Sequence, residues 1–232
     1  TDTLTAAQAL HRQQPQQQQG RDRRLAILNM ASSLRPGGGV LTGAQSQEEF
    51  LCTRTTLYPA LRDEFYRLPE VSVVFTRDVV IFRDAEGEDL PKLDRFRVDV
   101  ATGAMLRAED QDQDQDEEEG AGSANANANA TAWAISERGR ETILAKMRLL
   151  LRVLCSNQVK RVVLGAWGCG AYGNPVEDMA KLWRTVLVGG KKGRKEEWDG
   201  LEEVVFAITD SSQTNTFRRI FADVVSAQSS PY

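Results

Sequence analysis

The feature that most constrains this chain is a run of three glycines, at 37–39, followed seven residues later by Gln47-Glu48-Glu49. Glycine has no Cβ and accepts positive φ, so the backbone N–H groups of such a run can converge on an anion. The apolar stretch 25–31 just upstream is typical of a buried strand. The segment therefore predicts a strand, a glycine loop and a helix in succession, with a ligand at the end of the strand.

Size and charge limit the classes of protein that fit. With 232 residues, 41% of them hydrophobic, the chain can bury one sizeable core, so we expect one domain. The net charge is −4, and much of the acidity lies within 109–119. A nucleic-acid backbone is usually bound by a basic face, so we expect no direct nucleic-acid binding.

Cysteine and histidine usage restricts the chemistry. Three unevenly spaced cysteines fit reduced thiols in an intracellular protein of the nucleus or cytoplasm. The single histidine, His11, lies in the N-terminal segment, which argues against histidine catalysis and zinc sites with histidine ligands. We therefore expect no metal and no organic cofactor. No apolar stretch approaches the length of a membrane span, so we expect no membrane association.

Two polar tracts interrupt the globular pattern. Residues 1–20 contain a glutamine-rich stretch, which predicts a disordered leader before a domain at 21–232. Residues 109–131 collapse into Asp-Gln and Asn-Ala repeats, which predicts a disordered surface insertion in that domain.

The rest of the chain alternates between strand and helix patterns. We expect strands at 25–31, 71–75, 79–82, 96–101, 161–165 and 201–208, and helices at about 47–61, from Ser136, from Asn174-Pro175 and at 213–225. Ser136 and Asn174 are the expected N-caps, and Ile143, Met147, Leu150, Leu151 and Leu154 form one apolar helical face. This alternation predicts an α/β domain with helices on both faces of the sheet.

A second glycine-rich loop, GAWGCGAYGNP at 165–175, follows the expected strand 161–165. Together the two loops resemble the GGG-x6–8-QEE signature and the diphosphate loop of poly(ADP-ribose) glycohydrolases, in their microbial-type form. The resemblance extends over roughly 21–227. It implies a macrodomain-like mixed sheet between helices and hydrolysis of the ribose–ribose O-glycosidic bond, which releases ADP-ribose. The implied partners are poly(ADP-ribose) and ADP-ribosylated proteins, with the enzyme a monomer.

The resemblance also implies roles for individual residues. Glu49 would be the catalytic acid/base, and Glu48 would position the ribose at the scissile bond. Asn29 would bind the distal ribose hydroxyls, and the ring of Tyr172 would pack against that ribose. The substrate-binding residues implied in this way are Asn29, Gly37, Gly38, Gly39, Gln47, Gly165, Ala166, Trp167, Gly168, Cys169, Gly170, Ala171, Tyr172 and Gly173.

Each of these residues also has a structural interpretation. Ser46 and Glu49 form an S-x-x-E capping box, and the helix dipole favours the ionised form of a carboxylate there, which works against a general acid. Asn29 also fits a strand-end turn residue, and Tyr172 an aromatic residue of the core. Cys169 could be read as a nucleophile, but there is no histidine beside it to activate it.

Three functions remain open at this point. The hydrolase is the favoured one, and the alternatives are a non-catalytic ADP-ribose-binding module and a hydrolase of mono-ADP-ribosylated protein. Phe206, Asp210, Asn215 and Phe217 are candidates for adenine contacts, although core packing is the better interpretation of both phenylalanines.

Overall fold

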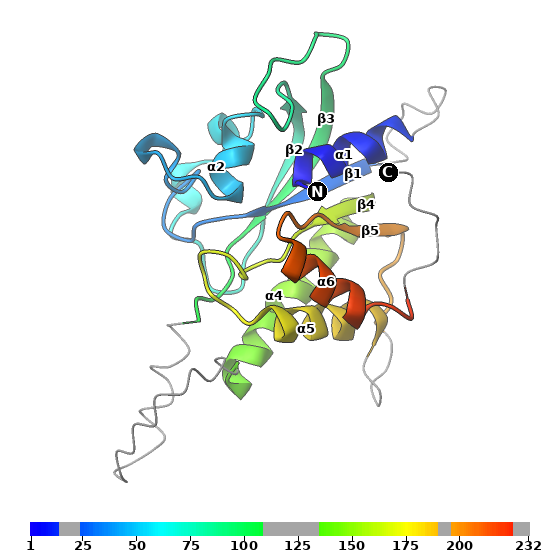
Figure 1. Cartoon of the computed structure of the whole chain (residues 1–232). Coiled ribbons are helices and arrows are strands. Elements are labelled where there is room, and N and C mark those ends of the chain that lie inside the picture. Colours follow the sequence, from blue (N-terminus) through cyan, green and yellow to red (C-terminus); the bar gives the residue numbers. More distant parts are fainter. Residues whose placement is uncertain (14–23, 109–134, 190–195, 225–232) are drawn as a thin grey trace.

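The computed structural model describes residues 1–13, 24–108, 135–189 and 196–224, and these build one five-stranded mixed sheet in the order β2-β3-β1-β4-β5 (Figure 1). Strands β1 (Arg24–Met30), β3 (Phe96–Gly103), β4 (Val159–Leu164) and β5 (Glu203–Phe206) are parallel. Strand β2 (Val74–Ile81) pairs antiparallel with β3 at one edge. The expected mixed α/β fold is confirmed.

Helices cover both faces of this sheet (Figure 1). Helices α1 (Thr3–Arg12) and α2 (Gln47–Cys52) pack on one face, and α4 (Glu137–Ser156), α5 (Val176–Val188) and α6 (Ser211–Ile220) lie on the other. Successive side chains of a strand point to opposite faces. Ile27 of β1 accordingly joins the cluster under α1, whereas Ala26 and Leu28 join the cluster under α4.

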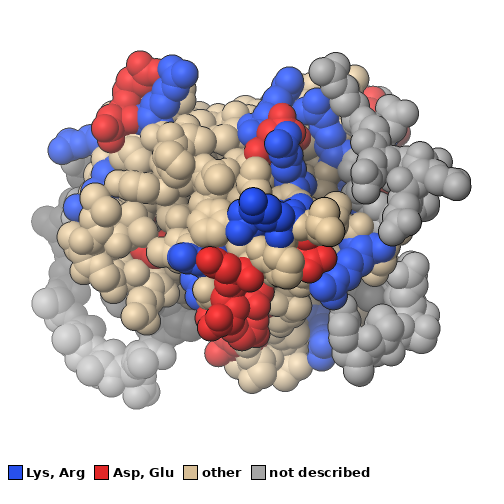
Figure 2. All heavy atoms as spheres, turned by 90° about the horizontal axis from the view of Figure 1, so that it is seen from above, with Lys and Arg blue, Asp and Glu red and all other residues tan. Residues whose placement is uncertain are grey.

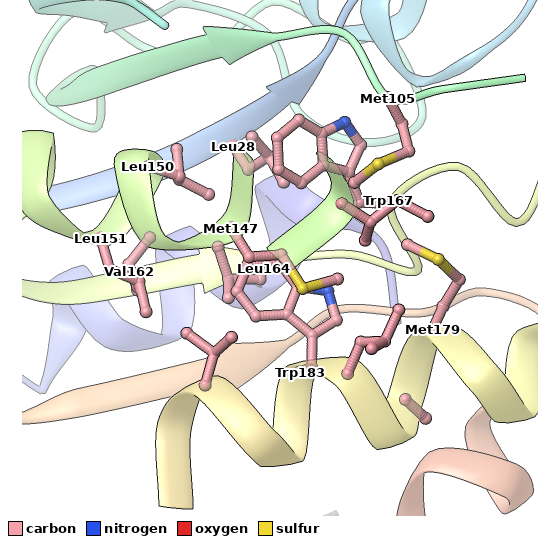
Figure 3. Close-up of a cluster of buried hydrophobic side chains, with 14 of the residues drawn as sticks. Leu28, Met105, Met147, Leu150, Leu151, Val162, Leu164, Trp167, Met179 and Trp183 are labelled. Atoms are coloured by element: carbon pink, nitrogen blue, oxygen red, sulfur yellow. The ribbon is translucent and has the colours of Figure 1, made fainter. Parts of the chain in front are cut away.

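The larger core lies under α4 and α5 (Figure 3). The five α4 residues expected on one apolar face, Ile143, Met147, Leu150, Leu151 and Leu154, are all fully buried. Trp167 and Trp183 join this layer with ring centroids 6.3 Å apart. The Ser136 side chain accepts from the Gly139 N–H at 3.1 Å, so the predicted N-cap is also confirmed.

The prediction of a disordered leader is wrong for Thr3–Arg12, which form α1. Asp2 caps this helix by accepting from the N–H groups of Leu4 and Thr5. Leu4 and Leu10 are buried against the sheet, and the Arg161 guanidinium donates to the Leu10 carbonyl at 2.9 Å. A short apolar stripe is enough to stabilise this helix, because the stripe packs against a sheet face. The glutamine-rich composition of the segment gave no sign of such a helix. Residues 14–20 of the predicted leader lie outside the described ranges.

Several element boundaries also differ from those predicted. The helix expected at 47–61 ends at Cys52. Thr55, within the expected helix, instead forms a β-bridge with Ile81 at the end of β2. The strands expected at 71–75 and 79–82 are one strand, β2, whose register shifts at a bulge around Asp78, a non-glycine residue with φ +57°. Strand β5 is shorter than expected, and α6 begins two residues early and ends at Ile220.

Asn174 is not the N-cap of α5, a position taken by Pro175. Its side-chain amide instead donates to the carbonyls of Leu106, at 2.7 Å, and Gly168, at 3.0 Å. Asn174 thus ties the loop after β4 to the segment after β3.

Two further observations concern the surface. The predicted insertion, 109–131, lies outside the described residues, and within the described ones no helix is long and apolar enough to cross a membrane. On the face shown in Figure 2, basic and acidic side chains are interspersed.

Candidate active site

A cavity of about 1040 Å³ opens where the parallel strands end. Its walls come from the loops after β1, β3 and β4 and from the start of α2. Because β1 lies between β3 and β4 in the sheet, the carboxyl ends of these three strands meet at one edge. This is the position at which open α/β sheets bind their ligands, and both glycine loops lie there.

Glu49 lies on the cavity wall at the first turn of α2. Its Oε1 accepts from the Gly39 N–H at 2.6 Å, and its Oε2 accepts from the Ser46 N–H at 3.0 Å and from the Ser46 hydroxyl. The predicted capping box is therefore present. Glu49 therefore both caps α2 and lines the cavity.

Glu48 also reaches the cavity wall, but its carboxylate is directed inward and only 1% of the residue is exposed. Its Oε1 accepts from the Asn29 side-chain amide at 3.3 Å, and its Oε2 accepts from the Ser32 N–H at 2.7 Å. Glu48 therefore braces the end of β1 and the loop that follows it.

The glycine run contacts these carboxylates directly. A Cβ on Gly38, whose φ is +56°, would stand 2.5 Å from Glu49 Oε1 and 2.9 Å from Glu48 Oε2. The Gly38 N–H donates to the Arg35 carbonyl, and the Gly39 N–H donates to Glu49. The expectation that these N–H groups point at a bound anion is wrong for Gly38 and Gly39. The glycines are needed so that the loop can pack against two carboxylates.

The two glutamates have opposite pKa shifts. Burial raises the pKa of Glu48 to about 7 and the Glu49 charge adds to the rise, while hydrogen bonds from Ser32, Asn29 and Gly37 partly oppose it. Burial also acts to raise the pKa of Glu49, but the hydrogen bonds from Ser46 and Gly39 outweigh it and leave that pKa below its ordinary value. In the free protein near neutral pH, Glu49 is ionised and Glu48 is partly protonated.

Gln47 uses its amide within the protein. The amide oxygen accepts from the Met30 N–H at 2.9 Å, and the amide nitrogen donates to the Leu28 carbonyl at 2.8 Å and to the Thr3 hydroxyl at 3.2 Å. Gln47 lines the cavity, but its polar atoms are taken. It anchors α2 to β1 and to α1, a role different from the substrate contact expected for it.

Asn29 is fully buried and is not part of the cavity wall. Its amide donates to Glu48 and, at 3.3 Å, to the Thr102 hydroxyl. The amide nitrogen is therefore occupied by Glu48 and Thr102, and the contact with ribose hydroxyls that the resemblance implies stays a prediction. Gly37 is also absent from the wall, because it packs against the ring of Tyr58.

The loop after β4 has the features of an anion site. The N–H groups of Gly168, Gly170, Ala171 and Tyr172 have no acceptor in the described part of the chain, and all four residues line the cavity. A Cβ on Gly168, at φ +85°, would stand 2.6 Å from Met105. Convergent backbone N–H groups in a turn are suited to a phosphate.

The other expected members of this loop divide into two groups. Ala166 and Trp167 line the cavity, although only 1% of Trp167 is exposed and it belongs to the core. Gly165, Cys169 and Gly173 are not in the wall. Burial raises the pKa of the Cys169 thiol to about 12, which argues against a nucleophile.

Tyr172 is half-buried on the cavity wall, and its hydroxyl donates to the Ala31 carbonyl at 3.3 Å. This hydrogen bond joins the loops after β4 and β1. Neither interpretation of Tyr172 is complete, because the ring both packs on the core and faces the cavity.

The expected adenine contacts do not line this cavity. Phe206 and Phe217 pack together with ring centroids 5.0 Å apart, which confirms the core interpretation of both. Asp210 caps α6 by accepting from the Gln213 N–H.

Sequence reasoning missed several contributors to the cavity, among them Ser32, Arg35, Met105 and Arg107. Met105 and Arg107 follow β3, the strand beside β1. The rule that parallel strands end at one edge would have found them once the strand order was known. In the described parts of the chain, no group of three or more histidine, cysteine, aspartate or glutamate side chains could hold a metal ion.

Comparison with known proteins gives consistent results. Residues 1–84 match the family model of the microbial-type PARG catalytic domain. No curated protein matches the sequence. The structure resembles the poly(ADP-ribose) glycohydrolase of Deinococcus radiodurans, solved with ADP-ribose, with a TM-score of 0.73 and 28% identity over 97% of this chain and 83% of that chain.

A second solved structure, the poly(ADP-ribose) glycohydrolase of Thermomonospora curvata, gives a TM-score of 0.71 and 27% identity over 94% of this chain and 73% of that chain. The family model covers the first glycine loop and the glutamate pair, and the structural matches extend the likeness over nearly the whole chain. The resemblance of this chain to the microbial-type poly(ADP-ribose) glycohydrolases, expected from its two glycine loops, is thereby confirmed.

Proposed function

We propose that this chain is a poly(ADP-ribose) glycohydrolase that cleaves the ribose–ribose O-glycosidic bond and releases ADP-ribose. The observation that carries the proposal is one cavity containing both a carboxylate, Glu49, and, on the loop after β4, four backbone N–H groups with no acceptor among the described residues. Both solved relatives are poly(ADP-ribose) glycohydrolases, and the first was solved with ADP-ribose.

In this proposal the loop after β4 binds the diphosphate of the terminal ADP-ribose. The N–H groups of Gly168, Gly170, Ala171 and Tyr172 supply hydrogen bonds to the phosphate oxygens. The distal ribose then lies between this loop and the start of α2, and the ring of Tyr172 forms part of its surroundings. This arrangement brings the scissile bond to Glu49.

Glu49 acts as acid and then as base. As the bond from C1″ of the distal ribose to the leaving oxygen breaks, C1″ becomes oxocarbenium-like and Glu49 gives its proton to the leaving oxygen. A water molecule then adds to C1″ and returns a proton to Glu49. One carboxyl group completes the cycle, which matters because Glu48 and Glu49 are adjacent and cannot face each other across one sugar.

The free protein holds Glu49 in its ionised form, so the acid step needs the substrate to raise its pKa. A bound diphosphate places negative charge nearby, and the bound polymer excludes water from the carboxylate. Both effects favour the protonated form. Glu48, partly protonated at neutral pH and hydrogen-bonded to Ser32, serves in this scheme to fix the loop beside the ribose.

The same lowered pKa favours the second candidate, a module that binds ADP-ribose without cleaving it. In that case the capping box would be the whole role of Glu49. A measurement of poly(ADP-ribose) turnover distinguishes the two functions.

The test is incubation with poly(ADP-ribose) of defined length, followed by sizing of the products, alongside a melting experiment with ADP-ribose. We expect release of ADP-ribose and a higher Tm, since a ligand selective for the folded state stabilises it. AMP, which lacks the distal ribose, should raise Tm far less. A Tm rise without cleavage would favour the binding module, and an unchanged Tm would contradict both functions.

A further inference from the structure

We propose that Arg107 and Arg35 form a second phosphate subsite at the rim of the cavity, for the diphosphate of the polymer unit on the leaving-group side of the cleaved bond. This inference rests on the proposed function and adds a determinant of substrate class. It would make the protein selective for polymer over ADP-ribose attached to a group without phosphate.

Arg107 is held in place on both sides by the loop after β4. The carbonyl of the preceding residue, Leu106, accepts from the Asn174 side chain at 2.7 Å, and the N–H of the following residue, Ala108, donates to the Tyr172 carbonyl at 2.9 Å. The guanidinium carbon lies 4.9 Å from the centroid of the Tyr172 ring. The side chain is exposed on the cavity wall, so the position is fixed while the charge remains accessible.

Arg35 reaches the same cavity from the loop after β1. It is exposed, and its carbonyl accepts the Gly38 N–H at 3.3 Å, which joins it to the turn that contacts both glutamates. Within the described ranges, neither Arg35 nor Arg107 forms an ion pair with a carboxylate.

The glutamates of the cavity do not neutralise these arginines. Glu48 is 1% exposed and directed at Asn29 and Ser32, and the oxygens of Glu49 accept from its own loop and cap. The rim thus presents two guanidinium groups without a carboxylate partner among the described residues, and their planar donor geometry is suited to phosphate.

The terminal diphosphate already has a set of donors in the N–H groups of the loop after β4. Two exposed arginines are additional to that set. The cavity, at about 1040 Å³, is at the upper end of the range for a single drug-sized ligand, which leaves room at its mouth for the neighbouring unit. A polymer with one diphosphate in every unit supplies the anion that the rim lacks.

The first test measures binding of fluorescently labelled poly(ADP-ribose) to Arg35→Gln and Arg107→Gln in a Glu49→Gln background, in which we expect turnover to be slow. We expect each change to weaken the affinity about 3–10-fold and to reduce the slope of log affinity against log salt by roughly 0.7–1. Arg218→Gln is the matched control, since Arg218 is exposed on α6, does not line the cavity and removes the same charge.

The second test compares two substrates in enzyme that retains Glu49, with and without each arginine substitution. One is poly(ADP-ribose), and the other is ADP-ribose with a phenol at C1″, whose leaving group has no phosphate. We expect the ratio of kcat/KM for polymer to that for the phenol compound to fall about 3–10-fold in each arginine variant.

Equal losses on both substrates, or an equal loss of ADP-ribose binding, would assign the arginines to the terminal unit and overturn the proposal. Unchanged polymer affinity and an unchanged salt slope would also overturn it. If the parent binds polymer in an arginine-dependent manner without cleaving it, the proposed hydrolase function fails while the subsite stands.

Discussion

Gly38 lies directly against Glu49, since a Cβ at this position would stand 2.5 Å from Glu49 Oε1. The same atom would lie 2.9 Å from Glu48 Oε2, and the backbone of Gly38 is in the left-handed region at φ +56°. The glycine run and the glutamate pair are therefore one packed unit, in which the spacing along the chain reflects a contact in space.

Gly38→Ala should consequently damage both stability and activity. We expect a loss of about 2–4 kcal/mol in the free energy of unfolding, from the left-handed backbone together with the steric conflict at the carboxylates. Turnover should fall with it, because Glu49 must move. Urea unfolding and product assays measure the two effects.

Gly43→Ala separates the two causes. Gly43 also has positive φ, at +85°, but a Cβ there would meet nothing within 4 Å. We expect a cost of about 1–2 kcal/mol from the backbone alone, with turnover retained. If Gly38→Ala is no more harmful than Gly43→Ala, the contact with the glutamates is unimportant.

Glu48 should make the protein less stable as the pH rises from about 4.5 to about 7. Its pKa is about 7 in the folded state against an ordinary value of 4.5 in the unfolded chain, so the folded state retains a proton that the unfolded state releases. The resulting loss is about 3 kcal/mol, complete above the folded pKa. Below pH 4.5 both states are protonated and the penalty vanishes.

Urea unfolding between pH 4 and pH 8 measures this dependence, with Glu48→Gln as the comparison. Gln lacks the titration, so the difference in stability between variant and parent should shift by about 3 kcal/mol in favour of the variant over that range. Its absolute stability is reduced at all pH values, because one amide oxygen cannot replace both acceptors for Asn29 and Ser32. Parallel pH profiles for the two proteins would contradict the raised pKa.

Thr3 and Gln47 should be coupled, because the Gln47 side-chain amide at the start of α2 donates to the Thr3 hydroxyl of α1 at 3.2 Å. Thr3→Val preserves shape and removes the hydroxyl, so we expect a cost of about 1 kcal/mol. Gln47→Ala removes hydrogen bonds to β1 as well, and should cost about 2–3 kcal/mol and lower turnover several-fold.

A double-mutant cycle provides the control for this pair. In the Gln47→Ala background, Thr3→Val should cost less than in the parent, since the partner is already absent. Strict additivity of the two changes would show that α1 does not support the site through Thr3.

The features that the sequence predicts correctly are those set by a local sequence pattern. The position of Glu49 at a helix start followed from the S-x-x-E spacing, and the strand before the glycines followed from its apolar run. The core face of α4 followed from helical periodicity, which depends on that helix alone.

The features that the sequence does not predict depend on contacts between residues that are distant in the chain. The resemblance assigned Asn29 to the substrate, but in the folded chain its amide donates to Glu48 and Thr102, which are distant in sequence. Helix α1 was hidden by a polar neighbourhood, and its burial requires the sheet face that Ile27 and Arg161 help to form. Arg107 enters the cavity only because β3 lies next to β1.

Glu49→Gln distinguishes catalysis from capping. The amide oxygen can still accept from Gly39, but Ser46 loses at least one acceptor, so we expect a cost of about 1–2 kcal/mol in stability. The amide cannot carry the proton, so turnover of poly(ADP-ribose) should fall by roughly 10²–10⁴-fold while ADP-ribose still raises Tm. Ser46→Ala is the matched control: it removes the cap hydroxyl at a similar cost of about 1 kcal/mol but leaves the carboxylate, so turnover should remain within a few-fold of the parent. Equal losses of turnover in the two variants would assign Glu49 to the helix cap and remove it from the chemistry.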